Sequence, residues 1–443
     1  MSDAIRIHDL STLSAAGRHA LLARTEADLG PFLDAVRPIV AAVKAEGDEA
    51  VARFTRDFDK ATVSADSLRV SQAALDAAPG LLEPGVMAAI DFAADSIRRF
   101  HEAQLPEEMW WKEVRPGVFA GDRIRPIPSV ACYVPRGKGA FPSVAMMTTI
   151  PALAAKVPNV VIITPPGRDG QVDTATLAVA KRVGVTQVFA AGGAQGVAAV
   201  AYGTATIPRC DKIVGPGSPY VVAAKRLLAD AIDTGTPAGP SESIILADDS
   251  VDGALAALDL IIESEHGPDS SAWLVTDSCR VAEQAAAALP RHWAEMSEGR
   301  AGFSCTVLTG PRGGIVLAPD WDAAIGFVND YAPEHLQILS RDPFADAARI
   351  DHAGEILLGP HTPVTIGNFV LGPNAVLPTG RHARTASPLS VFDFLKRTSI
   401  GYVSAAGYPA LAQQARALAT YEGFDGHARA VSEVRDALLG KRE

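Results

Sequence analysis

The stretch QVFAAGGAQGVAAVAY, residues 187–202, decides the fold class of this chain. It joins a short apolar, β-rich run at 187–190 to an Ala-rich amphipathic segment at 194–202 through a glycine turn. A strand that passes through glycines directly into a helix is the first half of a βαβ unit. The stretch therefore predicts a parallel sheet covered by helices.

The same alternation repeats on both sides of this stretch. Further strand and helix pairs are expected at 130–134 with 144–155, at 160–164 with 174–183, and at 212–214 with 220–231. After residues 235–241 the pattern resumes with strands at 243–246, 272–275 and 355–358 and helices at 251–265 and 280–289. We therefore expect an α/β fold of two doubly wound, Rossmann-like layers, with 235–241 as the crossover between them.

The two ends of the chain differ from this central part. Residues 35–54 and 84–100 carry apolar residues at three- and four-residue spacing, which predicts a helical N-terminal region. From residue 389 we expect an extended helical tail, with a helical stretch at 391–396, a turn at 401–407 and helices at 409–421 and 427–439.

Composition limits the classes of function. The 443 residues include 40 Lys and Arg against 51 Asp and Glu, so the net charge is −11, and 48% of the residues are hydrophobic. An acidic chain without a basic cluster disfavours nucleic-acid binding. No apolar run approaches the ~20 residues of a membrane span, and residues 1–10 are charged rather than signal-like. We therefore expect a cytoplasmic protein without a membrane partner.

The four cysteines are widely spaced and form no C-x-x-C pair: Cys132, Cys210, Cys279 and Cys305. This spacing argues against a zinc ribbon, a thioredoxin motif or a disulfide framework. It is typical of buried cysteines in a reducing compartment.

Glycine-rich turns are the first candidates for ligand binding. No G-x-G-x-x-G follows a strand, but residues 192–195 (GGAQ) and 215–218 (GPGS) each lie between a predicted strand and a helix. Such turns let backbone amides approach an anionic or planar ligand. Taken alone, however, these turns are more often tight strand-to-helix connections without a ligand.

Three further segments carry polar side chains suited to metal or proton chemistry. Glu263 and His266 share one face at the end of a predicted helix, which suits two zinc ligands but also occurs on ordinary surfaces. Glu334 and His335 are adjacent before an apolar strand, where each could serve a different proton transfer, or both could face solvent. His427 lies at a helix start, five residues after Glu422.

Taken in order, these segments resemble the histidinol dehydrogenase family over essentially the whole chain. The motifs that carry the resemblance are CYVPRG (132–137), GGAQ (192–195), DKIVGPG (211–217), AGPSE (238–242), EHGPDS (265–270), YAPEH (331–335), VLPTG (376–380), SPLS (387–390) and GHAR (426–429).

The resemblance implies an enzyme that oxidises a primary alcohol through an aldehyde to a carboxylate. Two NAD-dependent steps and one zinc ion per subunit are implied, in a homodimer with entwined tails. In that scheme His335 removes the hydroxyl proton, and Glu334 activates the water that hydrates the aldehyde. The other matched positions are Tyr133 and Gln195 at the cofactor, and Ser241 and Glu422 at the substrate.

The departures from the family pattern concern the ligand sites. Where the family has Gln, His, Asp and His as zinc ligands, this chain has Glu263, His266, Asn368 and His427. Carboxylate and amide have exchanged places, so the ligand set keeps its formal charge and zinc binding is expected to survive. These four residues and His335 also border the substrate. Ala375 replaces a substrate-contacting His, and Ser218 replaces a cofactor-contacting Asn.

The resemblance also implies domain bounds. Residues 1–28 would form an N-terminal tail, 29–132 with 241–388 a discontinuous first α/β domain, and 133–240 a second, NAD-contacting α/β domain. Residues 389–443 would form the tail that is swapped in the dimer and carries Glu422 and His427 into the partner's site.

Several functions stay open at this point. The preferred one is oxidation of a histidinol-like amino alcohol, either histidinol or a related substrate. A second is oxidation of a small polar diol such as sulfopropanediol, with Arg381, His382 and Arg384 as cationic candidates. A zinc hydrolase would leave the glycine turns without a role. Retention of Glu334 and His335 counts against an inactive binding paralogue.

Overall fold

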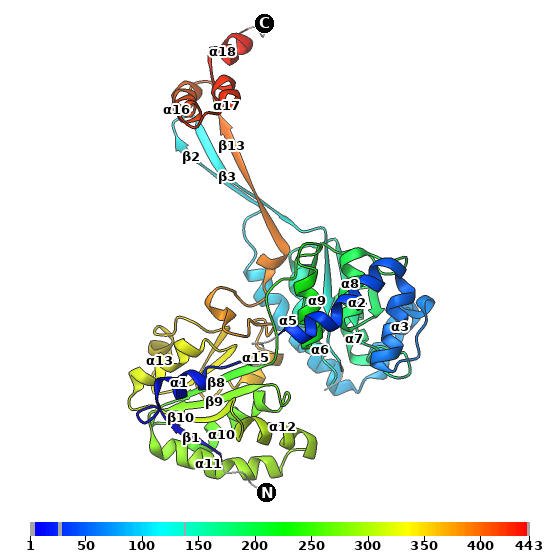
Figure 1. Cartoon of the computed structure of the whole chain (residues 1–443), viewed down its shortest axis with the longest axis vertical. Helices are drawn as coiled ribbons and strands as arrows, with labels where there is room; N and C mark the ends of the chain where they lie inside the picture. The colour runs from blue at the N-terminus through cyan, green and yellow to red at the C-terminus, as the bar shows by residue number, and fades with distance from the viewer. Residues whose placement is uncertain (1–4, 25–28, 137–138, 441–443) are drawn as a thin grey trace. The chain divides into compact units, whose positions relative to one another are not determined.

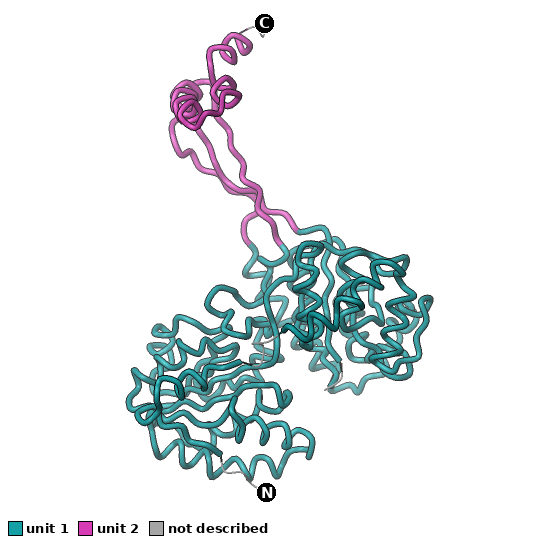
Figure 2. Tube along the Cα trace, in the orientation of Figure 1, with its two compact units in different colours: residues 1–105, 127–394 teal, residues 106–126, 395–443 magenta. Residues whose placement is uncertain are grey.

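The computed structural model describes residues 5–24, 29–136 and 139–440. The chain divides into two compact units (Figure 2), the first made of Met1–Leu105 and Ile127–Phe394, the second of Pro106–Pro126 and Leu395–Glu443. Gly137 of the first family motif, and parts of the predicted 1–28 tail, lie outside the described residues. The predicted domain bounds stay a prediction.

A six-stranded parallel sheet forms one layer of the first unit, in the order β1-β10-β9-β8-β11-β12. Four of its strands, β1, β10, β9 and β8, are labelled in Figure 1. Its strands are β1 (Ile7–Asp9), β8 (Glu242–Ala247), β9 (Ser271–Thr276), β10 (Gly313–Leu317), β11 (His335–Leu339) and β12 (Glu355–Leu358). The central strands β8, β9 and β11 are buried throughout. This explains why they appear in the sequence as continuous apolar runs.

Helices cover both faces of this sheet. Ile245 and Ala247 of β8 pack into a core with α10, α11 and α12, while Ile244 and Leu246 pack into the opposite core with α13. The helices of this layer are α1 (Ala15–Leu21), α10 (Gly253–Ser264), α11 (Cys279–Ala294), α12 (Glu298–Leu308), α13 (Trp321–Tyr331), α14 (Pro343–Ala347) and α15 (Val364–Phe369). Alternate residues of one strand thus serve two cores, which confirms the predicted doubly wound layer.

A four-stranded parallel sheet, in the order β6-β5-β4-β7, forms the other layer. Its strands are β4 (Ser129–Tyr133), β5 (Asn159–Thr164), β6 (Gln187–Ala190) and β7 (Lys212–Val214), and its helices are α6 (Pro142–Ala154), α7 (Thr174–Val183), α8 (Gly193–Tyr202) and α9 (Pro219–Leu227). The segment 187–202 forms β6 and α8, as its pattern predicts. Residues 235–241 connect this layer to β8 of the six-stranded sheet.

The predicted N-terminal helices complete the core of the four-stranded layer. They are α2 (Gly30–Glu46), α3 (Asp48–Asp59), α4 (Gln72–Ala77) and α5 (Pro84–Ala103), with short 3₁₀ turns η2 (Ala65–Ser67) and η3 (Ala78–Leu81). Val36 and Val43 of α2 and Val51 of α3 pack with α8 and α9. The helix predicted over 35–54 is interrupted at Gly47. This glycine has a φ of 60°, which a helix does not allow, so α2 ends before it and α3 begins after it.

The second unit corrects the predicted tail. The structure has a 3₁₀ turn η5 (Val391–Phe394) and then strand β13 (Leu395–Val403), where the sequence predicted a helical stretch and the start of a turn. β13 pairs antiparallel with β3 (Val118–Pro126), which also pairs with β2 (Met109–Arg115). The predicted helix at 409–421 is present as α16 (Tyr408–Tyr421), but the single helix predicted at 427–439 is instead two short helices, α17 (Asp425–Ala430) and α18 (Glu433–Leu439), separated at Ser432, which caps α18.

Among the described residues, no single helix is both long enough and apolar enough to cross a bilayer. The segments Gln72–Leu81 and Pro84–Ala103 meet these criteria only as a pair, and they are bent by 109° where they meet.

Candidate functional site

The adjacent Glu334 and His335 lie where β11 begins, at the same edge as the starts of β8 and β12. His335 is paired in register with Glu355 of β12 and Ser243 of β8. Glu334 ends the loop that follows α13, and a Cβ on Gly354 would lie 2.5 Å from the carbonyl oxygen of Glu334. The glycine at 354 therefore lets the two backbones approach closely in front of the site.

The two side chains form one buried cluster. Oε1 of Glu334 lies 3.9 Å from Nε2 of His335, and Oε1 of Glu355 lies 2.5 Å from Nδ1 of the same ring. The main-chain N–H of Glu242 donates to Oε2 of Glu334 at 2.8 Å. His335 is thus held by Glu355 on one nitrogen and faces Glu334 with the other, so the solvent-facing alternative is wrong.

Burial and mutual charge set the protonation states of this cluster. Burial alone lowers the pKa of His335, but the negative charges of Glu263 and Glu334 and the hydrogen bond with Glu355 raise it to about 10. Burial raises the pKa of Glu334 well above its ordinary value, and the nearby Glu263 adds to this rise. The cluster has more carboxylates than cationic partners, which is the electrostatic setting that attracts a further cation.

The candidate metal ligands of the first unit meet beside this cluster. Glu263 is buried at the end of α10, where the side-chain amide of Asn368 donates to its Oε1 at 2.7 Å. Nδ1 of His266 lies 3.2 Å from Oε2 of Glu263. Burial raises the pKa of Glu263, but His266, His335 and hydrogen bonds from Asn368 and Ser241 lower it below its ordinary value. The structure therefore brings Glu263, His266, Asn368, Ser241 and His335 together.

The donors fit a zinc site in part. In the described portion of the chain, no group of three or more His, Cys, Asp or Glu could hold a metal ion. The first unit supplies a carboxylate, an imidazole and the amide of Asn368, which leaves a tetrahedral ion one protein ligand short. The fourth predicted ligand, His427, belongs to α17 in the second unit, and Glu422 directly follows α16 there; both are exposed.

The candidate cofactor residues lie at the carboxyl ends of the four-stranded sheet, where ligands of open α/β sheets bind. The hydroxyl of Tyr133, at the end of β4, accepts a hydrogen bond of 3.1 Å from the N–H of Gly193. Within the described chain, Oε1 of Gln195 is buried without a hydrogen-bond partner. Ser218 is exposed at the start of α9.

The turn at 215–217 needs its glycines. Gly215 has a φ of 112°, and a Cβ there would lie 2.2 Å from the carbonyl oxygen of Tyr133. The buried amine of Lys225 donates to the Gly215 carbonyl at 2.6 Å. Burial lowers the pKa of Lys225 to about 8. The turn is thus fixed against the end of β4, so its shape is set before any ligand binds.

For the remaining predicted positions, the structure gives no side-chain contact with the Glu334–His335 cluster among the described residues. Ala375 is half-buried, next to Asn374, whose side chain donates to the carbonyl of Met147. Arg384 is exposed and bonds the carbonyls of Asn329 and Asp330. Arg381 is half-buried at a φ of 68°, and its side chain has no ion pair or hydrogen bond with the described residues.

Three residues of the cluster were not predicted: Arg24, Glu242 and Glu355. Glu242 stands in the AGPSE motif, and Glu355 begins a predicted strand, so both had a signal in the sequence. Arg24 had none, because its partners lie more than 200 residues away.

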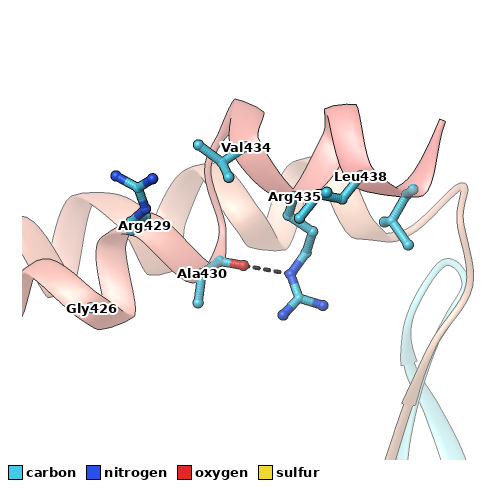
Figure 3. A pocket seen from close by; sticks show the side chains of 7 residues that line it. Gly426, Arg429, Ala430, Val434, Arg435 and Leu438 are labelled. Carbon is cyan, nitrogen blue, oxygen red and sulfur yellow. Dashed lines mark hydrogen bonds between the residues drawn. The ribbon is translucent and has the colours of Figure 1, made fainter. Parts of the chain in front are cut away.

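Two cavities of about 460 Å³ lie elsewhere. One is in the second unit, between α17 and α18, where Arg429, Val434 and Arg435 project from the two helices (Figure 3). The other is in the first unit and includes Lys212, Asp233 and Asp393. Neither includes Glu334 or His335, so the geometry of the cluster, rather than cavity size, marks the candidate site.

Comparison with known proteins finds relatives over nearly the whole chain. The family profile of histidinol dehydrogenase matches residues 22–435. The chain is 63% identical over 439 residues to histidinol dehydrogenase homolog 2 of Mesorhizobium japonicum, covering 99% of this chain and 100% of that protein. It is 45% identical over 434 residues to histidinol dehydrogenase of Synechocystis, covering 98% and 100%.

A solved structure has the same fold. Histidinol dehydrogenase from Elizabethkingia anophelis matches with a TM-score of 0.92 and 29% identity, covering 99% of both chains. The whole-length matches in sequence and in fold establish that this chain belongs to the histidinol dehydrogenase family.

Proposed function

We propose that this protein is a zinc-containing, NAD-dependent dehydrogenase that oxidises a primary alcohol through an aldehyde to a carboxylate. The observation that carries the proposal is the buried contact series Glu355–His335–Glu334 beside Glu263. Two successive oxidations of one carbon require two proton acceptors close together. The imidazole of His335 and the neighbouring carboxylate of Glu334 provide them.

His335 is the proposed base in both oxidations. Glu355 holds Nδ1, which leaves Nε2 to accept the hydroxyl proton of the alcohol. Glu334 then takes a proton from the water that adds to the aldehyde, while His335 returns the alcohol proton to the aldehyde oxygen, so that His335 is again free to take the hydroxyl proton of the hydrate in the second oxidation. Bound NAD would accept the hydride, while bound zinc would orient the substrate and offset the negative charges around His335.

The proposed zinc ligands are Glu263, His266 and Asn368 of one subunit and His427 of its partner. In the first unit, His266 and Asn368 both contact the carboxylate of Glu263. A shared ligand explains why the first unit alone offers an incomplete set. The proposed NAD contacts are Tyr133, Gln195 and Ser218; the proposed substrate contacts are Ser241, Ala375, Glu422, His335 and the four zinc ligands. The cytoplasmic location stays a prediction from the sequence.

The substrate is the finer part of the proposal. The family match supports a histidinol-like amino alcohol, because several relatives are named histidinol dehydrogenase. The exchange of carboxylate and amide, and the alanine at 375, change the polar groups that meet the substrate. The second candidate, a sulfonated diol, is favoured by Arg381, a half-buried guanidinium that makes no ion pair with the described residues.

The test measures zinc content and NADH formation with a panel of amino alcohols and diols. We expect one zinc ion per chain and NADH production on at least one substrate. Protein that is free of zinc and reduces no NAD with any of them contradicts the proposal. Complementation of a histidine auxotroph then separates histidinol from other substrates, and Arg381→Met should affect only an anionic one.

A further inference from the structure

Arg24 is a buried arginine whose contacts converge on the backbone around Glu334. Its Nε lies 2.7 Å from Oε1 of Glu242, and both side chains are more than nine-tenths buried. Its Nη2 donates to the carbonyl of Tyr331 at 2.7 Å, and its Cζ lies 3.3 Å from the centre of the Tyr331 ring. One guanidinium thus contacts the last residue of α13 and the first residue of β8.

Both residues that Arg24 contacts are also neighbours of Glu334, Tyr331 along the chain and Glu242 through a hydrogen bond. Tyr331 lies three residues before Glu334, at the start of a turn in which Ala332 has a φ of 54°. Glu242 donates its own main-chain N–H to Oε2 of Glu334 and accepts the N–H of Gly380 on Oε1. The Tyr331 hydroxyl also bonds Ser271.

We propose that Arg24 is a positioning residue for Glu334: by fixing Tyr331 and Glu242 together, it holds the Glu242 N–H against Oε2 of Glu334. With Oε2 held by that bond, the other carboxylate oxygen of Glu334, Oε1, lies on the side that faces His335. The proposal rests on the proposed function, in which Glu334 serves the hydration of the aldehyde. Arg24 itself touches neither substrate nor cofactor.

Arg24 also balances a charge. Glu242 is buried, and its negative charge disfavours the charged form of Glu334. Removing Arg24 alone leaves the Glu242 carboxylate buried without its cation, whereas removing both charges does not. A double variant that removes both charges leaves no unbalanced carboxylate. It therefore distinguishes the loss of the Arg24 contacts from general damage to the fold.

The experiment compares Arg24→Met, Arg24→Met with Glu242→Gln, and Arg24→Lys. Each is assayed separately for oxidation of the alcohol and of the aldehyde. Arg24→Met should lower kcat for the aldehyde by about 10- to 100-fold, change kcat for the alcohol much less, and release free aldehyde that a hydrazide reagent traps. The double variant leaves no unbalanced carboxylate and should recover stability, but it also lacks the bridge between Tyr331 and Glu242 and should keep the selective loss of aldehyde oxidation.

Two comparisons keep the result interpretable. Arg18→Met removes an exposed arginine that contacts Asp330, the residue before Tyr331 in α13, and it should show no selective loss. Arg24→Lys keeps the charge but cannot reach Glu242 and Tyr331 together, so it should lose aldehyde oxidation to an intermediate degree. It replaces Arg24→Met in the comparison if the latter does not fold.

Equal losses in both oxidations, or a double variant that oxidises the aldehyde as fast as wild type, overturn the proposal. A wild-type protein that forms no NADH contradicts the proposed function instead. In that case a crystal structure of the Arg24 variant decides: the proposal requires the 2.8 Å contact between Glu242 N and Glu334 Oε2 to be lost, and an unchanged contact overturns it.

Discussion

At the scale of single residues, the site depends on how one imidazole is held. Glu355 contacts Nδ1 of His335 at 2.5 Å, and both side chains are less than a tenth exposed. The contact fixes which nitrogen faces Glu334. A buried imidazole without this partner could turn, and its proton-accepting nitrogen would no longer be defined.

Glu355→Gln is therefore expected to lower kcat for alcohol oxidation by roughly 10²-fold, part of the ~10²–10⁴-fold that a positioned base contributes. The matched control is Asp259→Asn, which alters a buried carboxylate that bonds Gln337 of the same strand. Steady-state assays of both variants give the result. Equal losses in the two would show that kcat depends on the integrity of β11 rather than on the His335 contact.

Lys225 makes a second residue-scale prediction, which concerns stability. Its pKa is lowered by burial to about 8 from an ordinary 10.5, so between these pH values the unfolded chain binds more protons than the folded one. The free energy of unfolding should rise with pH through this window, by roughly 1.4 kcal/mol per unit of pKa difference, and this gain is absent below pH 8.

Denaturant unfolding of wild type and Lys225→Met from pH 7 to 10 tests this. The difference in unfolding free energy should shift in favour of the wild type as pH rises. Lys181→Met, which removes an exposed lysine paired with Asp76, controls for the loss of one charge. A difference for Lys225→Met that does not change with pH would show that its amine is not held as the structure has it.

At the scale of elements, the glycine turns at the carboxyl ends of the strands leave little room for a Cβ. A Gly→Ala substitution there should affect both stability and cofactor binding. Gly215→Ala would force a Cβ to 2.2 Å from the Tyr133 carbonyl at a φ of 112°. We expect a loss of about 1–3 kcal/mol in unfolding free energy and a higher KM for NAD.

Gly302→Ala is the matched control for this substitution. Gly302 is exposed in α12 with open space around its Cβ position, so alanine there should stabilise by about 0.5–1 kcal/mol and leave KM unchanged. Calorimetry and NAD titration of both variants check the pair. A Gly215→Ala protein with wild-type stability and KM would contradict the described turn.

The elements that the sequence predicted are those with the strongest burial pattern. The central strands β8 and β9 are continuous, fully buried runs, because helices cover both faces of their sheet. β1, β2, β3, β10 and β13 were not predicted. Every residue of β2 and most of β13 are exposed, and no alternation marks them. Glu334 and His335 were found as neighbours in sequence. Arg24 was not, because only the folded chain brings it to Glu242.

At the scale of the whole molecule, the second unit has little core of its own. No residue of α16 or α17 is buried, and large apolar side chains are exposed on it, including Trp110, Trp111, Leu418 and Leu438. Such surface is typical of a protein interface. It supports the proposed homodimer, in which His427 would complete the partner's zinc site.

Mixing two inactive variants tests that arrangement. His335→Ala and His427→Ala homodimers should each be inactive, while subunit exchange creates dimers with one site that carries both histidines. Random exchange should restore about a quarter of wild-type activity, since about half of the dimers are mixed and each has one intact site. Activity that stays absent after proven exchange would place His427 in its own subunit's site, and a His427→Ala homodimer that is active by itself would place it in none.

The most direct test of the central claim is the amount of NADH formed per alcohol consumed by the zinc-loaded protein. A site in which His335 serves two oxidations and Glu334 serves the hydration between them predicts two NADH and a carboxylate product for each alcohol. One NADH with the aldehyde as final product, or none with any alcohol, would contradict it.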